Sequence, residues 1–136
     1  MTTIALVDDH KIVRQCIKGL LEDEPDFRVI GEAANGTEGI ELVENLKPDI
    51  LISDLMMDGL NGIDVTREVR KRSPETKTII ISLYNDSGYV TRALKEGAKG
   101  WVLKGSGIDE LVTAIRRVAS GKRYLSPSIA EKDSQS

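Results

Sequence analysis

The stretch of sequence that decides the fold is residues 4–9, which read IALVDD. Four apolar residues in succession are too few for a stable helix and predict a buried strand, which the two acids end. Further strands are expected at 27–34, 50–52, 78–82 and 100–103. Because the apolar residues are mostly continuous rather than alternating with polar ones, these runs are typical of parallel strands that are covered on both faces.

Segments with helical spacing separate the predicted strands. Between Val13 and Leu21, apolar side chains recur at intervals of three and four residues, as on one face of a helix, and Pro25 bounds this segment. The other helices are expected at 40–46, from Asn61 to before Pro74, from Asp86 to Gly97, and from Ser106 to Gly121. Asp86 and Ser106 are candidate N-caps, and Gly97 and Gly121 are candidate C-terminal stops.

Five strand–helix units in succession predict an α/β fold, namely a doubly wound, five-stranded parallel sheet with helices on both faces. Each crossover is expected to be right-handed, and ligands of such sheets bind at the carboxyl ends of the strands. The pattern stops at Gly121, and residues 122–136 are polar and lack a helical apolar stripe. We therefore expect one domain over residues 1–121 and a linker or tail over residues 122–136.

The composition is that of an ordinary globular protein. Its 136 residues suit one domain, and 19 Lys and Arg against 22 Asp and Glu give a formal charge of −3. An acidic balance argues against a stand-alone nucleic-acid binder. The single cysteine, Cys16, cannot form an internal disulfide, and we expect it to be buried on the apolar face of its helix in a cytoplasmic protein. Neither a membrane span of roughly 20 apolar residues nor a signal peptide is evident.

Chemically useful side chains stand where the predicted strands end. Asp8 and Asp9 follow the first strand, Asp54 follows the third, Ser82 closes the fourth, and Lys104 follows the fifth. Each of them alone has an ordinary interpretation as a turn acid, a strand-end serine or a surface lysine. Because parallel strands end at one edge of their sheet, however, all five side chains are expected to converge in one crevice.

These groups together indicate phosphoryl chemistry. Three neighbouring carboxylates repel one another, and a divalent cation removes that conflict. Oxygen ligands without a cluster of His or Cys suit Mg²⁺ or Mn²⁺. The lysine and the hydroxyl are complementary to a phosphoryl group, for which a carboxylate can be the nucleophile, giving an aspartyl phosphate.

Four motifs carry a resemblance to a known family, namely residues 7–10 (VDDH), 53–57 (SDLMM), 81–84 (ISLY) and 97–104 (GAKGWVLK). In this order and at this spacing, they resemble the receiver domain of two-component response regulators over residues 3–121. The resemblance implies the flavodoxin-like strand order 2-1-3-4-5. The set of motifs is specific, whereas no single one of them is.

The resemblance assigns roles to the acids. It implies that Asp54 is the phosphoacceptor, that Asp9 and Asp54 bind Mg²⁺ directly, and that Asp8 binds it through water. The backbone carbonyl of Met56 would supply a further oxygen ligand. Asp58 departs from the family pattern, which often has proline at this position.

The resemblance also implies roles for the groups around the phosphoryl site. Lys104 would pair with the phosphoryl group, and Ser82 would donate a hydrogen bond to it. Ser82 and Trp101 would form the conformational switch, although the family usually has Tyr or Phe where this sequence has Trp101. Met56 and Tyr84 flank the site at positions that tune the lifetime of the phosphoryl group in this family.

Residues 119–127 (ASGKRYLSP) resemble the end of receivers of the NarL/FixJ type, which a LuxR-type helix-turn-helix DNA-binding domain follows. We therefore expect a receiver that takes a phosphoryl group from a sensor histidine kinase and controls a transcription-regulator domain missing from this chain. DNA would be bound only through that domain, and no membrane partner is expected. Homodimerisation is left open. Self-phosphorylation and self-dephosphorylation would be its only enzymatic chemistry.

Other functions fit the sequence less well. A stand-alone receiver and a phosphorylation-independent pseudo-receiver remain alternatives. A phosphohydrolase of the haloacid-dehalogenase type would place its second acid two residues after the first, whereas Asp8 and Asp9 are adjacent, and it usually has a cap insertion. A nucleotide-binding relative would carry a glycine-rich loop after the first strand, where this sequence has acids.

Overall fold

Strands and helices alternate along the chain, as the apolar runs and helical spacings predict. The computed structural model of the protein describes residues 1–83 and 86–127. The elements are β1 (Thr2–Val7), α1 (Lys11–Glu22), β2 (Phe27–Ala33), α2 (Gly36–Leu46), β3 (Ile50–Asp54), α3 (Gly62–Arg72), β4 (Lys77–Ser82), α4 (Ser87–Lys95), β5 (Gly100–Leu103), the 3₁₀ turn η1 (Lys104–Ser106), α5 (Ile108–Ala119) and β6 (Tyr124–Leu125).

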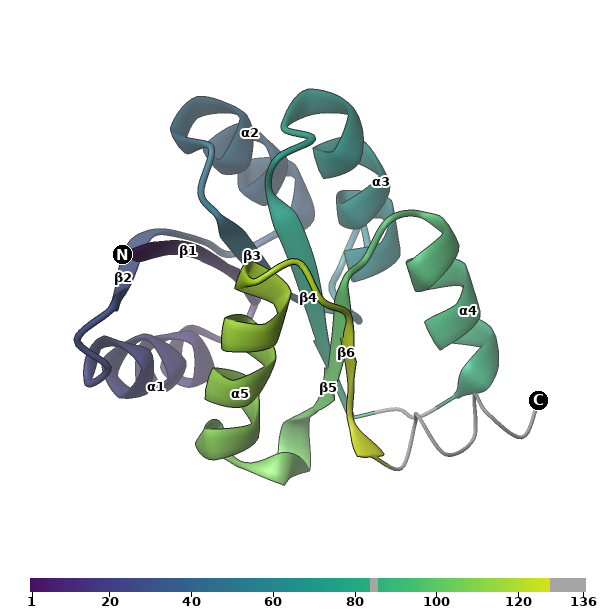
Figure 1. The fold of residues 1–136 in the computed structure, drawn as a ribbon. Coiled ribbons are helices and arrows are strands. Elements are labelled where there is room, and N and C mark those ends of the chain that lie inside the picture. Colours follow the sequence, from purple (N-terminus) through teal and green to yellow (C-terminus); the bar gives the residue numbers. More distant parts are fainter. Residues whose placement is uncertain (84–85, 128–136) are drawn as a thin grey trace.

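The strands form one sheet in the order β2-β1-β3-β4-β5-β6, and all neighbouring pairs are parallel (Figure 1). The order 2-1-3-4-5 is thus confirmed, but the prediction of five strands is wrong by one. Tyr124 and Leu125, expected in a polar tail, pair with Gly100 and Trp101 of β5. Two residues are too few to show a periodicity, and their strand forms because the outer edge of β5 offers hydrogen-bonding groups.

The helices cover both faces of the sheet (Figure 1). On one face, side chains such as Ile4 and Leu6 pack with α1 and α5. The next residues along the same strand, Ala5 and Val7, point to the other face and pack with α2 and α3. This alternation of side chains along a strand, with both sides apolar, explains why the buried strands read as continuous apolar runs.

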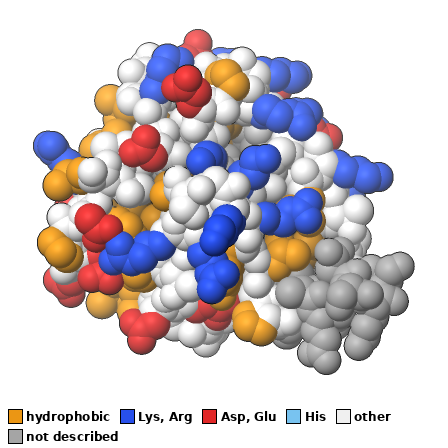
Figure 2. All heavy atoms as spheres, viewed as in Figure 1, with side chains coloured by type: hydrophobic (Ala, Val, Ile, Leu, Met, Phe, Trp, Pro, Cys, Tyr) orange, Lys and Arg blue, Asp and Glu red, His pale blue; other side chains and the backbone are white. Residues whose placement is uncertain are grey.

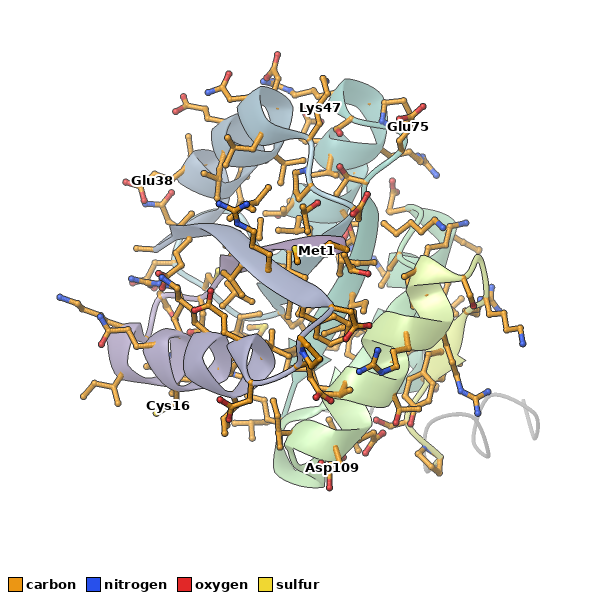
Figure 3. All side chains as sticks on the ribbon, turned by 60° about the vertical axis from the view of Figure 1, so that its left-hand side comes forward. Met1, Cys16, Glu38, Lys47, Glu75 and Asp109 are labelled. Atoms are coloured by element: carbon orange, nitrogen blue, oxygen red, sulfur yellow. The ribbon has the colours of Figure 1, made fainter. Side chains whose placement is uncertain are left out.

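The two helices on the first face differ in how much they bury. Helix α5 buries four residues, whereas α1 buries only Leu21. Cys16 is exposed on the outer side of α1 (Figure 3), so its predicted burial is wrong. Helical spacing identifies residues that share a face, but the sheet and α5 cover only part of the face of α1.

A shallow apolar groove runs between these two helices, lined by Val13, Ile17 and Leu20 of α1 and by Ile108 and Leu111 of α5. Hydrophobic side chains reach the surface in this part of the molecule, on the left of Figure 2. The groove follows from the incomplete cover of α1.

Helix ends mostly follow the expected capping chemistry. The Asp86 side chain accepts hydrogen bonds from the first turn of α4, and Asn61 and Asp64 form a capping box at the start of α3. The predicted Ser106 cap is wrong, because η1 occupies residues 104–106 and α5 begins after Gly107, whose φ of 90° suits glycine. Among the described residues, no helix has the length and apolarity needed to cross a membrane.

Candidate functional site

The carboxyl ends of four strands bring the predicted site residues to one edge of the sheet. Asp8 follows β1, Asp54 ends β3, Ser82 ends β4, and Lys104 follows β5. The strand register fixes this arrangement, because Asp54 pairs with Ile81, the residue before Ser82. The topology alone therefore carries side chains that are far apart in sequence to one place.

Three carboxylates and an imidazole form a compact cluster at this edge. One ligand atom from each of Asp8, Asp9, His10 and Asp54 lies within 4.8 Å of all the others. Asp8 and Asp54 are buried, whereas Asp9 is exposed. Most of the potential ligands are carboxylate oxygens, which hard divalent cations prefer. The cluster therefore fits a cation of this class.

His10 contributes the imidazole of this cluster. It is the N-cap residue of α1, and its Nδ1 lies 3.2 Å from Asp8 Oδ1 and 3.0 Å from Asp9 Oδ1. Its backbone N–H donates to Asp8 Oδ1 over 2.8 Å. This backbone bond fixes one oxygen of Asp8 whatever the protonation of the ring.

Lys104 reaches into the cluster from the opposite side. Its Nζ lies 3.1 Å from Asp54 Oδ2 and 3.9 Å from Asp8 Oδ2. Burial raises the pKa of Asp54 above its ordinary value, the hydrogen bond and charge of Lys104 oppose that rise, and the charges of Asp8 and Asp9 add to it. The ionised form of Asp54 is therefore disfavoured in the folded protein, and additional positive charge nearby would stabilise it.

The predicted switch residues are both buried. Ser82 is 1% exposed and lies opposite Leu103 of β5. Trp101 is also 1% exposed, and its indole packs with Leu55, Ile63 and neighbouring apolar residues between the sheet and helices α3 and α4. The larger ring is therefore accommodated facing inward.

The remaining predicted site residues lie around Asp54 or outside the described part. Met56 follows the buried Leu55, and half of its surface is exposed. Asp58 is exposed in the same loop. Tyr84 lies outside the described residues. Beyond Leu55, whose carbonyl accepts from the Gly62 N–H over 2.8 Å, the chain turns into α3.

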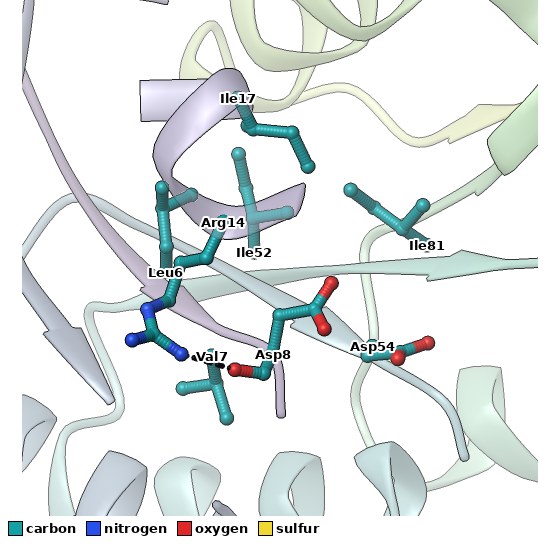
Figure 4. A pocket seen from close by; sticks show the side chains of 8 residues that line it. All are labelled: Leu6, Val7, Asp8, Arg14, Ile17, Ile52, Asp54 and Ile81. Atoms are coloured by element: carbon teal, nitrogen blue, oxygen red, sulfur yellow. Dashed lines mark hydrogen bonds between the residues drawn. The ribbon is translucent and has the colours of Figure 1, made fainter. Parts of the chain in front are cut away.

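Arg14 is part of the site and was not singled out from the sequence. Its Nη1 donates to the backbone carbonyl of Asp8 over 2.5 Å (Figure 4). Its Nε donates to Glu32 Oε1 over 3.1 Å. Lys18 also lies 3.5 Å from Glu32. The positions of Arg14 and Lys18, four residues apart, place them on one side of a helix. Their acidic partner on β2 becomes evident only in the folded sheet.

Gly62 is a second residue that the sequence did not reveal. A Cβ atom at this position would lie 2.5 Å from the backbone oxygen of Asp54 and 3.1 Å from the Cα of Leu55. Only glycine allows the first turn of α3 to approach the end of β3 this closely. The position of Asp54 thus depends on residue 62 being a glycine, which has no side chain.

Strand β5, which leads to Lys104, is held by β6 and by Ser126, the residue after β6. The Ser126 N–H donates to the carbonyl of Trp101, and the Leu103 N–H donates to Ser126 Oγ, both over 3.0 Å. The Ser126 hydroxyl in turn donates to Glu110 Oε1 over 2.6 Å, and the Tyr124 hydroxyl donates to the same oxygen over 3.1 Å. Residues expected in a tail therefore anchor one wall of the site.

Comparison with known proteins agrees with this geometry. A family model described as the response regulator receiver domain matches residues 4–116. The chain is 37% identical over 126 residues to the transcriptional regulatory protein DegU of Brevibacillus brevis, with 93% of this chain and 53% of that protein covered. It is 39% identical over 127 residues to the nitrate/nitrite response regulator protein NarL of Escherichia coli, with 93% and 59% covered. The chain thus spans somewhat more than half the length of these relatives.

A solved structure gives the same result. The crystal structure of a LuxR-family two-component response regulator from an Aurantimonas species superposes with a TM-score of 0.95 at 36% identity, with 99% of this chain and 96% of that chain covered. Together with the matched family model, this similarity shows that the chain belongs to the response regulator receiver domains, with relatives of the NarL and LuxR type.

Proposed function

We propose that this chain is a phosphorylation-controlled switch in which Asp54 accepts a phosphoryl group from a sensor histidine kinase. The observation that carries the proposal is the position of Asp54, a buried carboxylate with acids on one side and the Lys104 ammonium 3.1 Å away on the other. A buried nucleophile between positive and metal-binding groups suits the transfer of an anionic group.

The transfer needs little from the protein beyond placement and charge. An oxygen of Asp54 attacks phosphorus, the bond from phosphorus to the kinase imidazole nitrogen breaks, and an aspartyl phosphate forms. Mg²⁺ or Mn²⁺, bound by Asp8, Asp9, Asp54 and the carbonyl of Met56, would supply positive charge to the phosphoryl oxygens. Hydrolysis of the aspartyl phosphate by water resets the switch. Catalysis of other reactions is not part of the proposal.

Lys104 and Ser82 supply the response to the new group. The ammonium of Lys104, now paired with Asp54, moves to the phosphoryl oxygens, and the Ser82 hydroxyl donates a hydrogen bond to them. These contacts stabilise one conformation over the other, which is what a ligand-driven shift requires. Trp101, on the strand that precedes Lys104, is the aromatic member of the switch. Met56 and Tyr84 adjust access to the phosphoryl group.

The output of the switch lies outside this chain. The relatives are named as transcriptional and nitrate/nitrite response regulators, and the chain spans somewhat more than half of their length. We propose that a LuxR-type DNA-binding domain follows residue 136 in the complete cytoplasmic regulator, and that DNA contacts this domain alone. The formal charge of −3 supports the absence of direct DNA binding by the receiver. The alternative is a receiver that acts without such a domain.

Intact-mass spectrometry after incubation with acetyl phosphate and Mg²⁺ tests the proposal. The wild type should gain one phosphoryl group, and Asp54→Ala should gain none. Asp58→Ala, which removes an exposed acid four residues away, is the matched control and should still be phosphorylated. Incorporation into Asp54→Ala would show that another residue is the acceptor. Failure of the wild type to react would favour a pseudo-receiver, which binds partners without phosphoryl chemistry.

A further inference from the structure

We infer that Arg14 and Glu32 form a positioning pair that holds Asp8 in place for a divalent cation while keeping the guanidinium of Arg14 away from the Asp8 carboxylate. The inference rests on the proposed function, because it concerns the cation that the acid cluster would bind. It assigns a role to two residues outside the cluster itself. Neither carries a carboxylate or hydroxyl that the proposed chemistry uses.

The first observation is where Arg14 makes its contact. Its guanidinium donates to the backbone carbonyl of Asp8 and not to the carboxylate. In Figure 4, the Asp8 carboxylate points away from Arg14 and toward the side on which Asp54 lies. The arginine therefore fixes the turn between β1 and α1 through the backbone of Asp8, and the carboxylate oxygens of Asp8 face the cluster.

The second observation is that the charge of Arg14 is balanced elsewhere. The side chain is 13% exposed and bonds to Glu32 Oε1, and Glu32 is also 3.5 Å from Lys18. An arginine pairs strongly with any carboxylate within its reach, and the nearest cluster acid is the very residue whose carbonyl it touches. Glu32 keeps the guanidinium turned toward β2, so that it does not neutralise Asp8.

The pair thus has two separable parts. Loss of Arg14 should loosen the turn and weaken cation binding, as the loss of groups that orient metal ligands generally does by 10–100-fold. Loss of Glu32 alone should also weaken binding, because the released guanidinium competes with the cation for Asp8. Loss of both residues should weaken cation binding by less than the product of the two single effects. Without Arg14, no guanidinium competes with the cation for Asp8.

Mn²⁺ binding to the unphosphorylated protein, measured by electron paramagnetic resonance and calorimetry, tests the inference without any turnover. Arg14→Met should weaken Mn²⁺ affinity about 10-fold. Glu32→Gln should weaken it several-fold. The double variant should bind no worse than Arg14→Met, which is a coupling that independent effects would not give.

Matched variants separate this role from general damage to the fold. Lys18→Met removes the other ion pair of Glu32 without touching Asp8, and it should leave Mn²⁺ affinity unchanged. Arg14→Lys keeps the charge but cannot reach both the Asp8 carbonyl and Glu32, so it should weaken Mn²⁺ affinity by a smaller factor than Arg14→Met. This variant keeps the inference testable if Arg14→Met folds poorly. Each variant is first compared with the wild type by thermal melting in EDTA.

The outcomes distinguish this inference from the proposed function. If the wild type binds Mn²⁺ and accepts a phosphoryl group while Arg14→Met and Glu32→Gln bind Mn²⁺ equally well, the inference is overturned and the proposed function stands. Strictly multiplicative losses in the double variant would overturn the competition by Arg14 in the same way. If the wild type neither binds Mn²⁺ nor reacts with acetyl phosphate, both fail together.

Discussion

The two sides of the acid cluster are built differently. On the side of Asp8, the Arg14 side chain of α1 donates to the backbone carbonyl of Asp8, and Glu32 balances the charge of Arg14. On the side of Lys104, the short edge strand β6 and Ser126, which follows it, hold β5, and the Lys104 ammonium is already paired with Asp54. One side thus positions a carboxylate that the arginine beside it leaves unpaired, and the other positions an ammonium that already pairs with Asp54 at 3.1 Å and lies 3.9 Å from Asp8.

Because of this difference, we expect cation affinity and folding stability to depend on different residues. The Asp8 side depends on residues within the first 32 of the chain, and we expect its variants to change cation affinity. The Lys104 side depends on contacts with residues up to 126, and we expect its variants to change folding stability as well as chemistry. Four experiments test this division, beginning with the largest expected effect.

Replacing Lys104 by alanine should slow phosphoryl incorporation from acetyl phosphate on the order of 100-fold, because one preorganised charge next to the reacting group is lost. The time course of intact mass measures the rate. Lys99→Ala, which removes an exposed lysine just before the start of the same strand, should react at the wild-type rate. Equal rates for Lys104→Ala and the wild type would contradict a role for this side of the site in the chemistry.

Replacing Ser126 by alanine should lower the free energy of unfolding by about 1–3 kcal/mol, because the Leu103 N–H loses its acceptor and Glu110 loses a donor. Urea titration measures the change. The exposed Ser106 of η1 offers a control, since its replacement by alanine should change stability by less than about 0.5 kcal/mol. An equally small change for Ser126→Ala would mean that β6 does not anchor the Lys104 side.

Replacing Asp54 by asparagine should raise the melting temperature by a few degrees at pH 7 in EDTA. Burial raises the pKa of Asp54 above 3.8 in the folded state, so the stability that its protonated form contributes is complete below pH 3.8 and is lost as the pH rises through the raised value. Asparagine stays neutral at every pH. The advantage of Asp54→Asn should therefore shrink as the pH falls toward 3.8.

Two comparisons sharpen the experiment on Asp54. Asp58→Asn removes an exposed acid of the same loop and should show no such pH-dependent gain. Addition of Mg²⁺ should stabilise the wild type more than Asp54→Asn and so narrow the gap between them, because ligand binding to the folded state adds stability. A gap that does not change with pH would show that the charge of Asp54 is not its cause.

The smallest effect is expected at Cys16. Its thiol should react completely with an aromatic disulfide reagent without denaturant, and Cys16→Ser should change the free energy of unfolding by less than about 0.5 kcal/mol. Cys16 lies on the same helix as Arg14 but on its exposed side, so Mn²⁺ affinity should also be unchanged. Protection of the thiol until unfolding would contradict the exposed outer side of α1.

The sequence predicts most of the fold and the clustering of the acids, for a simple reason. Parallel strands that read as apolar runs end at one edge, so Asp8, Asp54 and Lys104 could be brought together from their positions after such runs. The strand order came from the resemblance to receivers. Nothing in apolar periodicity alone distinguishes it from other orders of five parallel strands.

The features that were missed depend on contacts between elements. Arg14 and Glu32 are ordinary charged residues until β2 is placed beside β1, and Ser126 is an ordinary serine until β6 is placed beside β5. Cys16 fits the helical period of α1, yet a period does not state how much of a face is covered. Gly62 matters through the space that a side chain would fill, which a sequence pattern does not record.

The sixth strand has a further consequence, which concerns the solution behaviour of the protein. Without β6, the outer edge of β5 would be open, and an open edge invites pairing with another chain. A chain shortened at Gly121 would keep Asp8, Asp54 and Lys104, yet we expect it to associate as its concentration rises. With β6 in place, the edge is only two residues long and Pro127 follows soon after it. Since proline has no backbone N–H, β6 also offers few hydrogen-bonding groups with which a strand of a neighbouring chain could pair.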